Sequence, residues 1–331
     1  MKMAKRIKKG SALLLALTLI LSGMAFSRVT AALGIETDRK CSVTFQVDGD
    51  LESEFAELAG IDIPVKVYKV ADVSESGKYT ALDGFESLDL ESVTSETTAA
   101  EWEEKAAKAT QILEETQAPA TAEGMIQNGS GTIRDLSAGM YLAAAQEVKS
   151  ETYAYKFTPY LISLPNNYNG TGNDDWVYDV TAGLKPGRED LFGKLVIDKT
   201  LTSFNASLGK ATFVFQVEGV RDGESVYSDV VSIVFDGAGT KSVVIDKIPA
   251  GAEVTVTEIY SGASYELTSS PSQTVKIQAS EEGEEGKEVH VSFTNDYNEK
   301  MNGGASVVNH FVNNDGSWSV EQQPDSTQQE E

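Results

Sequence analysis

Hydrophobic and polar residues alternate along many short stretches of the chain, which is typical of β-strands with one buried face. In the first half, residues 41–47 (CSVTFQV) and 61–67 (IDIPVKV) carry this pattern, and the stretches MYLAAAQ and PYLISLP are further apolar segments bounded by turn residues. One stretch has helical spacing instead, with Trp102, Ala106, Ala109 and Leu113 separated by charged residues. We therefore expect a mainly β first domain with one inserted helix.

The second half, from about residue 193 to residue 298, is almost entirely strand-like. Its segments are KLVIDKT, ATFVFQVEG, VVSIVF, SVVIDKI, EVTVTEI, TVKIQA and VHVSFTN. Many short strands separated by Gly, Asp, Ser and Pro indicate a β-sandwich. We predict two tandem Ig-like β-sandwich domains at 39–185 and 193–298, with a linker at 186–192 and a polar tail at 299–331 that is disordered or serves as a spacer.

The first 27 residues have the pattern of a secretory signal peptide. Basic residues cluster before position 10, an apolar run spans 12–24, and small residues follow at 25–27. The run is shorter than the roughly 20 residues of a membrane span, and no second run follows. Residues 28–38 then form a short leader. We expect an exported protein without a transmembrane segment. We also expect no lipid anchor, because Cys41 is far from the apolar run.

The strong negative charge limits the possible partners. The formal net charge is −24, and loss of the signal peptide would remove only positive charges. Nucleic acid and anionic membranes are therefore poor partners. Because Cys41 is the single cysteine, no disulfide can form within the chain. It lies on the apolar face of its strand and is most simply a core residue.

Three polar residues continue apolar, inward-facing stripes of the second domain. Lys199 follows Leu195 and Ile197, Glu258 follows Val254 and Val256, and Asn295 follows Val291 and Phe293, always at the two-residue period of a strand. Burial lowers the pKa of a lysine and raises that of a glutamate, so the three could form a neutral amine, a protonated acid and a carboxamide. The other interpretation is a buried Lys-Glu ion pair, with Asn295 capping a strand end.

These residues lie in segments that resemble the Cna B-type domains of Gram-positive surface proteins, namely VIDKT, IPAGAEVTVTEI with Tyr265, and VSFTNDY. The resemblance implies that Lys199 condenses with Asn295 into an isopeptide bond, with release of ammonia. Glu258 would be the catalytic acid that shuttles the proton. The reaction is intramolecular and occurs once, so we do not expect an enzyme in the usual sense.

A second motif ends the first domain and resembles that of sortase-assembled pilins. Trp176, Val180 and Lys185 have the family's spacing, and the upstream segment is similar to an N-terminal pilin domain. The resemblance implies that sortase joins Lys185 to another subunit, which requires an accessible lysine, and Pro186 and Gly187 are expected to end regular pairing nearby.

Two features depart from the pilin pattern. The motif residues Ala-Gly-Leu-Lys-Pro replace the usual Val-Tyr-Pro-Lys-Asn, and the sequence shows no LPxTG-like sorting signal.

Other sites are less well supported by the sequence. In the first domain a set of Lys69, Glu147 and Asn166 is conceivable for an internal bond, although its first strand has no inward lysine. His290 points outward and His310 lies in the tail, so neither suggests a catalytic triad or a zinc site. The acidic loops lack the ordered ligand pattern of a calcium site. We expect no cofactor and no metal.

Two functions remain from the sequence. The first is a structural subunit of a covalent pilus at the cell surface or cell wall, with sortase and other pilin subunits as partners. The alternative is a secreted or wall-associated adhesin that binds a host matrix or glycan ligand and does not polymerise.

Overall fold

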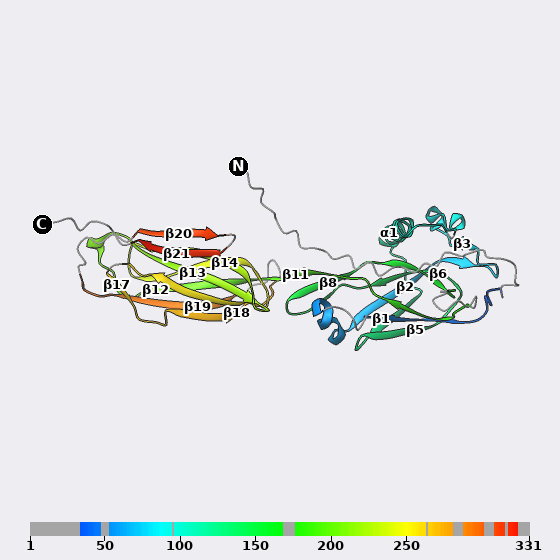
Figure 1. The fold of residues 1–331 in the computed structure, drawn as a ribbon, viewed down its shortest axis with the longest axis horizontal. Coiled ribbons are helices and arrows are strands. Elements are labelled where there is room, and N and C mark those ends of the chain that lie inside the picture. Colours follow the sequence, from blue (N-terminus) through cyan, green and yellow to red (C-terminus); the bar gives the residue numbers. More distant parts are fainter. Residues whose placement is uncertain are drawn as a thin grey trace. The chain divides into compact units, whose positions relative to one another are not determined.

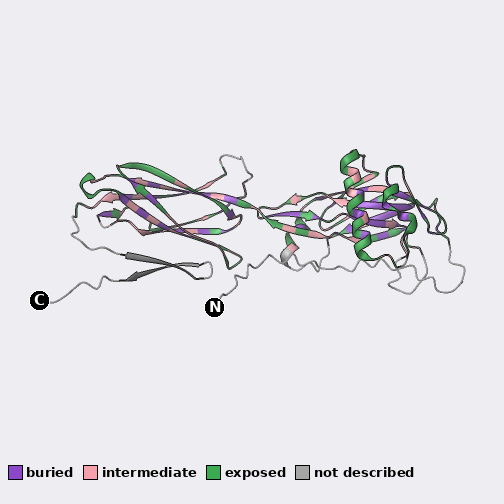
Figure 2. Ribbon diagram, turned by 90° about the horizontal axis from the view of Figure 1, so that it is seen from above, coloured by how far each residue is buried: buried purple, intermediate pink, exposed green. Residues whose placement is uncertain are grey.

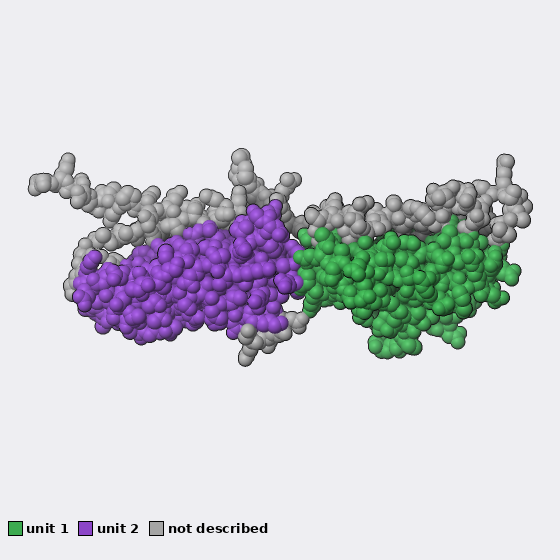
Figure 3. All heavy atoms as spheres, turned by 90° about the horizontal axis from the view of Figure 1, so that it is seen from below, with its two compact units in different colours: residues 1–150, 154–189 green, residues 151–153, 190–331 purple. Residues whose placement is uncertain are grey.

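The computed structural model describes residues 34–47, 53–94, 96–167, 176–262, 264–280, 287–300, 308–314 and 317–323, with backbone alone for 53, 54 and the last two ranges (Figure 1). The fold is mainly β, as predicted. The chain divides into two compact units, residues 1–150 with 154–189 and residues 151–153 with 190–331, coloured separately in Figure 3. The signal peptide predicted at 1–27 lies outside the described residues. No helix in the described ranges is long and apolar enough to cross a membrane.

In the residues that the structure describes, the first unit contains strands together with one α-helix and three 3-10 helices. The elements are β1 (Cys41–Gln46), η1 (Ser53–Gly60), β2 (Ile63–Val73), β3 (Tyr79–Ala81), η2 (Glu86–Leu88), η3 (Leu90–Ser92), α1 (Ala99–Thr116), β4 (Ala122–Ile126), β5 (Ser130–Leu136), β6 (Gly139–Ala145), β7 (Val148–Lys149), β8 (Tyr153–Phe157), β9 (Tyr160–Leu164), β10 (Asp179–Gly183) and β11 (Pro186–Asp190). One sheet has the order β10-β1-β5 and another the order β3-β2-β6-β9, with β4 also paired to β2. The remaining sheet has the order β11-β8-β7.

Helix α1 begins at a capping box, in which Thr98 and Glu101 satisfy each other's backbone N–H groups. Its predicted apolar face is confirmed: Trp102, Ala106 and Ala109 are buried against the core that includes β6 and β9. The opposite face is exposed (Figure 2). The helix is therefore fixed in rotation by its buried residues.

Two intervals differ from the expectations at the ends of the first domain. Pro186 and Gly187 do not end pairing; they begin β11, which lies next to β8. Proline fits at the first position of a strand, where a missing N–H is tolerated. In the predicted leader, Ile35 is buried in the core of the first unit and its N–H donates to the Glu75 carbonyl at 2.9 Å.

The second unit is a sandwich of two four-stranded sheets, in agreement with the predicted fold class. Its elements are β12 (Phe192–Leu201), η4 (Ala206–Leu208), β13 (Ala211–Arg221), β14 (Glu224–Phe235), β15 (Gly239–Pro249), β16 (Glu253–Tyr260), β17 (Tyr265–Leu267), β18 (Ser272–Lys276) and β19 (Val289–Tyr297). The sheets have the orders β15-β12-β19-β17 and β14-β13-β16-β18. The first and last of these eight strands, β12 and β19, are parallel neighbours.

The polar tail contains structure that we did not expect. Strands β20 (Val308–Asn314) and β21 (Ser317–Gln323) pair in antiparallel register, with Phe311 opposite Val320. Asp315 and Gly316 separate the two strands in the sequence, and Asp-Gly between alternating apolar residues is a hairpin signal. The overall polarity of 299–331 hid this local pattern.

Candidate functional site

Lys199 lies in β12 on the inward face of its sheet. Alternation along the strand places it after Leu195 and Ile197, and all three residues have no exposed surface. The facing strand β13 contributes Phe213 and Phe215, whose ring centroids are 4.5 and 5.8 Å from the Lys199 Nζ atom. The amine therefore lies in a water-excluded, aromatic part of the core.

Glu258 approaches the same point from the other sheet. It belongs to β16, and its side chain is 1 % exposed. Its Oε2 atom accepts a hydrogen bond from Lys199 Nζ at 2.6 Å. The backbone N–H of Glu258 donates to the Pro271 carbonyl at 3.0 Å, which fixes the strand at this position.

Asn295 completes the cluster from β19, next to β12 in the same sheet. The parallel register pairs Leu201 with Asn295, and the Thr202 N–H donates to the Asn295 carbonyl at 3.0 Å. The buried Asn295 side chain accepts a hydrogen bond from Lys199 Nζ through Oδ1 and donates from Nδ2 to Glu258 Oε1 at 2.7 Å. Each of the three side chains thus contacts the other two.

Burial dominates the electrostatics of Lys199. Desolvation lowers the pKa of the amine below its ordinary value, although the hydrogen bond and charge of Glu258 oppose that shift. A lowered pKa makes the neutral, nucleophilic form of the amine more accessible. The arrangement brings together an amine, a carboxyl group and a carboxamide, which are the groups needed for amide exchange.

The pilin-like motif lies at the end of the first unit. Trp176 is partly buried against the core, and Val180 in β10 is 6 % exposed and paired with Val43 of β1. Lys185 follows β10 and is partly exposed. The backbone on either side of it is held, since the Leu184 N–H donates to the Gln46 carbonyl and the Lys185 carbonyl accepts from the Thr158 N–H.

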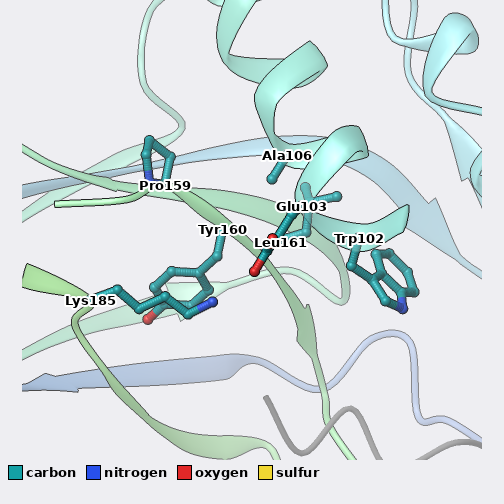
Figure 4. A pocket seen from close by; sticks show the side chains of 7 residues that line it. All are labelled: Trp102, Glu103, Ala106, Pro159, Tyr160, Leu161 and Lys185. Atoms are coloured by element: carbon teal, nitrogen blue, oxygen red, sulfur yellow. The ribbon is translucent and has the colours of Figure 1, made fainter. Parts of the chain in front are cut away.

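The Lys185 side chain lines a small pocket between α1 and β9 (Figure 4). The other lining residues are Trp102, Glu103, Ala106, Pro159, Tyr160 and Leu161. The Lys185 Nζ atom lies 5.8 Å from the centroid of the Tyr160 ring. The Tyr160 hydroxyl donates to the Gly183 carbonyl at 3.0 Å, so the ring is anchored to the strand that precedes the lysine.

The structure does not bring the conceivable first-domain set together. Lys69 Nζ pairs with Asp72 at 2.6 Å and donates to the Ser137 hydroxyl at 2.9 Å. Asn166 forms a bridge with Val177 through its backbone, and Glu147 is exposed.

The remaining candidate residues show no catalytic or metal arrangement in the described part of the chain. His290 Nδ1 lies 2.8 Å from Asp198 Oδ2, and Ser242 donates to that same carboxylate rather than to the histidine. His310 belongs to β20, whose side chains are not described. Cys41 is buried, and desolvation raises the pKa of its thiol to about 11. No group of three His, Cys, Asp or Glu in the described ranges is placed to hold a metal ion.

Sequence reasoning did not identify the surroundings of either lysine. In the sequence, Phe213 and Phe215 are ordinary apolar positions of a β-strand. Only their contact with Lys199 in the fold distinguishes them from other core residues. Glu103 and Tyr160 are distant from Lys185 in the sequence, so their convergence depends on how α1 packs on β9. The solvent-facing position of Glu103 beside the buried Trp102 was the available signal.

One family model matches part of the chain. It is described as a domain of unknown function (DUF5979) and covers residues 195–298. The matched segment runs from β12 to the residue after β19, so it includes Lys199, Glu258 and Asn295. No curated protein matches the chain.

Several solved structures are similar to this chain at low sequence identity. The full-length major pilin SpaD of Corynebacterium diphtheriae is 11 % identical, with 81 % of this chain and 100 % of that chain covered and a TM-score of 0.28. The SpaE basal pilin of Lactobacillus rhamnosus GG is 12 % identical, with coverages of 76 % and 89 % and a TM-score of 0.30. The T6 backbone pilin of Streptococcus pyogenes is 12 % identical, with coverages of 67 % and 57 % and a TM-score of 0.32.

Proposed function

We propose that this chain is a structural subunit of a covalently assembled surface pilus, joined to its neighbours through Lys185 and stabilised internally by a Lys199-Asn295 isopeptide bond. The observation that carries the proposal is the buried contact among Lys199, Glu258 and Asn295. Taking an amine and a carboxylate out of water is costly, and a plain ion pair returns little net stability. An amide bond between Lys199 and Asn295 would remove the charge of the amine from this buried site.

The geometry supports a specific reaction. Lys199 Nζ attacks Cγ of Asn295, a new C–N bond forms, and the bond from Cγ to Nδ2 breaks. The two oxygens of Glu258 already contact the attacking nitrogen and the leaving nitrogen. The carboxyl group can therefore take a proton from the amine and deliver one to Nδ2, which leaves as ammonia. The low-dielectric surroundings favour the neutral amine that this step requires.

The position of the bond suits a protein under tension. It would join β12 to β19, neighbouring strands at opposite ends of the sandwich sequence. A load that enters at β12 would leave through β19 across one amide bond and would not stretch the strands between them. In this chain with a single cysteine, the amide bond would supply the covalent stabilisation that a disulfide supplies in other proteins.

The intersubunit bond is proposed for Lys185 on different grounds. The motif residues Trp176 and Val180 are held in the first unit, while Lys185 follows them with part of its side chain exposed. An acceptor lysine must be reachable by an enzyme that carries another subunit, and the buried Lys199 is not. Secretion through residues 1–27 and location at the cell surface belong to the same proposal.

Intact mass and tryptic mapping of the recombinant mature chain test the internal bond. We expect a deficit of one ammonia molecule and a cross-linked peptide that joins Lys199 to Asn295. The deficit should disappear in Glu258→Ala and remain in Glu253→Ala, an exposed glutamate on the same strand.

The same preparation, incubated with a class of sortase that polymerises pilins and with a sorting-signal peptide, should acquire the peptide at Lys185. Lys185→Arg should remain unmodified, whereas the exposed Lys78→Arg should react normally. A full sequence mass and no modification at Lys185 would together reject the pilus subunit and favour a non-polymerising adhesin.

A further inference from the structure

The Lys185 pocket also contains a carboxylate, that of Glu103. Glu103 is exposed and lies one residue after the buried Trp102, on the side of α1 that borders the pocket. In Figure 4 the Glu103 carboxylate and the Lys185 ammonium both point into the space beside Tyr160. Within the part of the chain that the structure describes, no ion pair engages Lys185. The pocket therefore holds the Glu103 carboxylate, which can accept a proton, and the Lys185 ammonium, which can donate one.

The walls of this pocket are rigid on both sides. Trp102 and Ala106 are buried, which fixes the rotation of α1 and hence the position from which Glu103 extends. On the other side, backbone hydrogen bonds at Leu184 and Lys185 fix the start of the lysine side chain. The Glu103 side chain is exposed, so a change of its rotamer would not disturb the core.

We propose that Glu103 positions the Lys185 amine and accepts its proton during transfer to the acyl group of another subunit, an inference that rests on the proposed function. An ammonium cannot attack, and at neutral pH a lysine on the protein surface is almost fully protonated. In the step, the Lys185 nitrogen bonds to the acyl carbon and the bond from that carbon to sortase breaks. The ammonium loses two protons in this step. One is taken by the sortase group that is released from the acyl carbon, and the other passes to Glu103.

A second effect of the same carboxylate works in the opposite direction. A negative charge beside an ammonium stabilises the ammonium against loss of its proton. If that were the only role of Glu103, its removal would accelerate transfer at neutral pH. If the carboxylate accepts the proton, the ammonium and the carboxylate react together, and transfer does not depend on the supply of neutral amine.

The dependence of transfer rate on pH separates these roles. We would measure sortase-catalysed transfer of a sorting-signal peptide to Lys185 in the full mature chain, as the ratio of each variant to the unaltered chain. The ratio cancels the pH dependence of sortase itself. For Glu103→Gln we expect about a hundredfold loss near neutral pH. The ratio should recover by about tenfold per pH unit as neutral amine becomes available. Glu104→Gln, an adjacent exposed glutamate, should give a ratio near one at every pH.

Other outcomes would overturn the inference. A Glu103→Gln ratio at or above one would mean that the carboxylate only holds the ammonium, and a reduced but pH-independent ratio would mean that it only shapes the pocket. An unaltered chain that accepts no peptide would reject the proposed function itself. Pulse acetylation with acetic anhydride checks the amine without sortase: the yield at Lys185 relative to Lys78 should fall in Glu103→Gln and not in Glu104→Gln.

Discussion

At the scale of single residues, Lys199 is the group whose protonation matters most for folding stability. When the bond to Asn295 is absent, the lysine stays ionisable in a site with no solvent exposure. Its pKa in the folded protein is lowered, chiefly by desolvation, while in the unfolded chain it keeps the ordinary value. Between these two pKa values the unfolded state binds more protons than the folded state, so stability must rise with pH there.

We therefore predict that Asn295→Ala, which cannot form the bond but keeps the Lys199-Glu258 pair, becomes more stable as pH rises toward the ordinary pKa of a lysine. Urea unfolding followed through the second unit measures this change. Lys199→Met in the same background should lose the rise because no amine remains to titrate. An equal rise in that double variant would assign the effect to other groups.

The buried polar set could be predicted from the sequence because strand alternation has an exact period of two. Once Leu195 and Ile197 are assigned inward, Lys199 is inward as well, and the same holds for Glu258 and Asn295. The period does not give distances between strands, so it could not tell whether the three would meet. The residues around Lys185 could not be predicted in this way, because they come from one helix, one strand and the residues after another strand.

At the scale of elements, α1 determines where the acidic wall of the Lys185 pocket lies. The helix depends on its N-terminal capping box, in which the Thr98 hydroxyl accepts from the Glu101 N–H at 3.3 Å and the Thr98 N–H donates to the Glu101 carboxylate at 2.6 Å. The Thr98 N–H, together with the Thr98 hydroxyl, which donates to the same carboxylate oxygen at 2.8 Å, holds the pKa of Glu101 below its ordinary value. The cap is thus complete at neutral pH and weakens as acid protonates the carboxylate.

We predict that Thr98→Ala lowers the stability of the first unit by about 1 kcal/mol, because one helix N–H loses its acceptor. Urea unfolding monitored by the fluorescence of the buried Trp102 gives the value. Thr116→Ala serves as the control: this hydroxyl donates to the Ile112 carbonyl, which already belongs to the helix ladder, so its loss should change little. Similar losses in both variants would show that the cap is not the cause.

Elements with strong periodicity were predicted and those with mixed signals were not. The helix and the long strands of both units have clear apolar faces. Strand β11 begins at Pro-Gly, which usually indicates a turn, and was assigned to a linker. The β20-β21 hairpin lies in a tail whose overall polarity predicts disorder, and the alternation around Phe311 and Trp318 is too short to outweigh that signal.

At the scale of the whole molecule, the proposed bond changes how the chain responds to force. Lys199 and Asn295 are separated by 96 residue positions. With the bond in place, pulling on both ends should unfold the first unit but not extend this interval. We predict that Asn295→Ala adds an unfolding event with an extra contour length of roughly 300 Å, from about 3.3–3.6 Å for each residue.

Single-molecule force spectroscopy on the full mature chain measures this length, with Glu258→Ala as a second variant that should behave alike. The events assigned to the first unit should be the same in all three proteins. If the unaltered chain already showed the longer extension, the bond would not be present in it.

The parallel pairing of β12 with β19 also has a consequence for how such a domain can diverge. Once these two strands are joined, the residues from β13 to β18 form a closed ring beside the path of the load. Insertions in the turns of that ring would enlarge it without lengthening the loaded path, so new surface loops could arise there at little mechanical cost. Residues before Lys199 and after Asn295 carry the load directly and should tolerate far less variation in length.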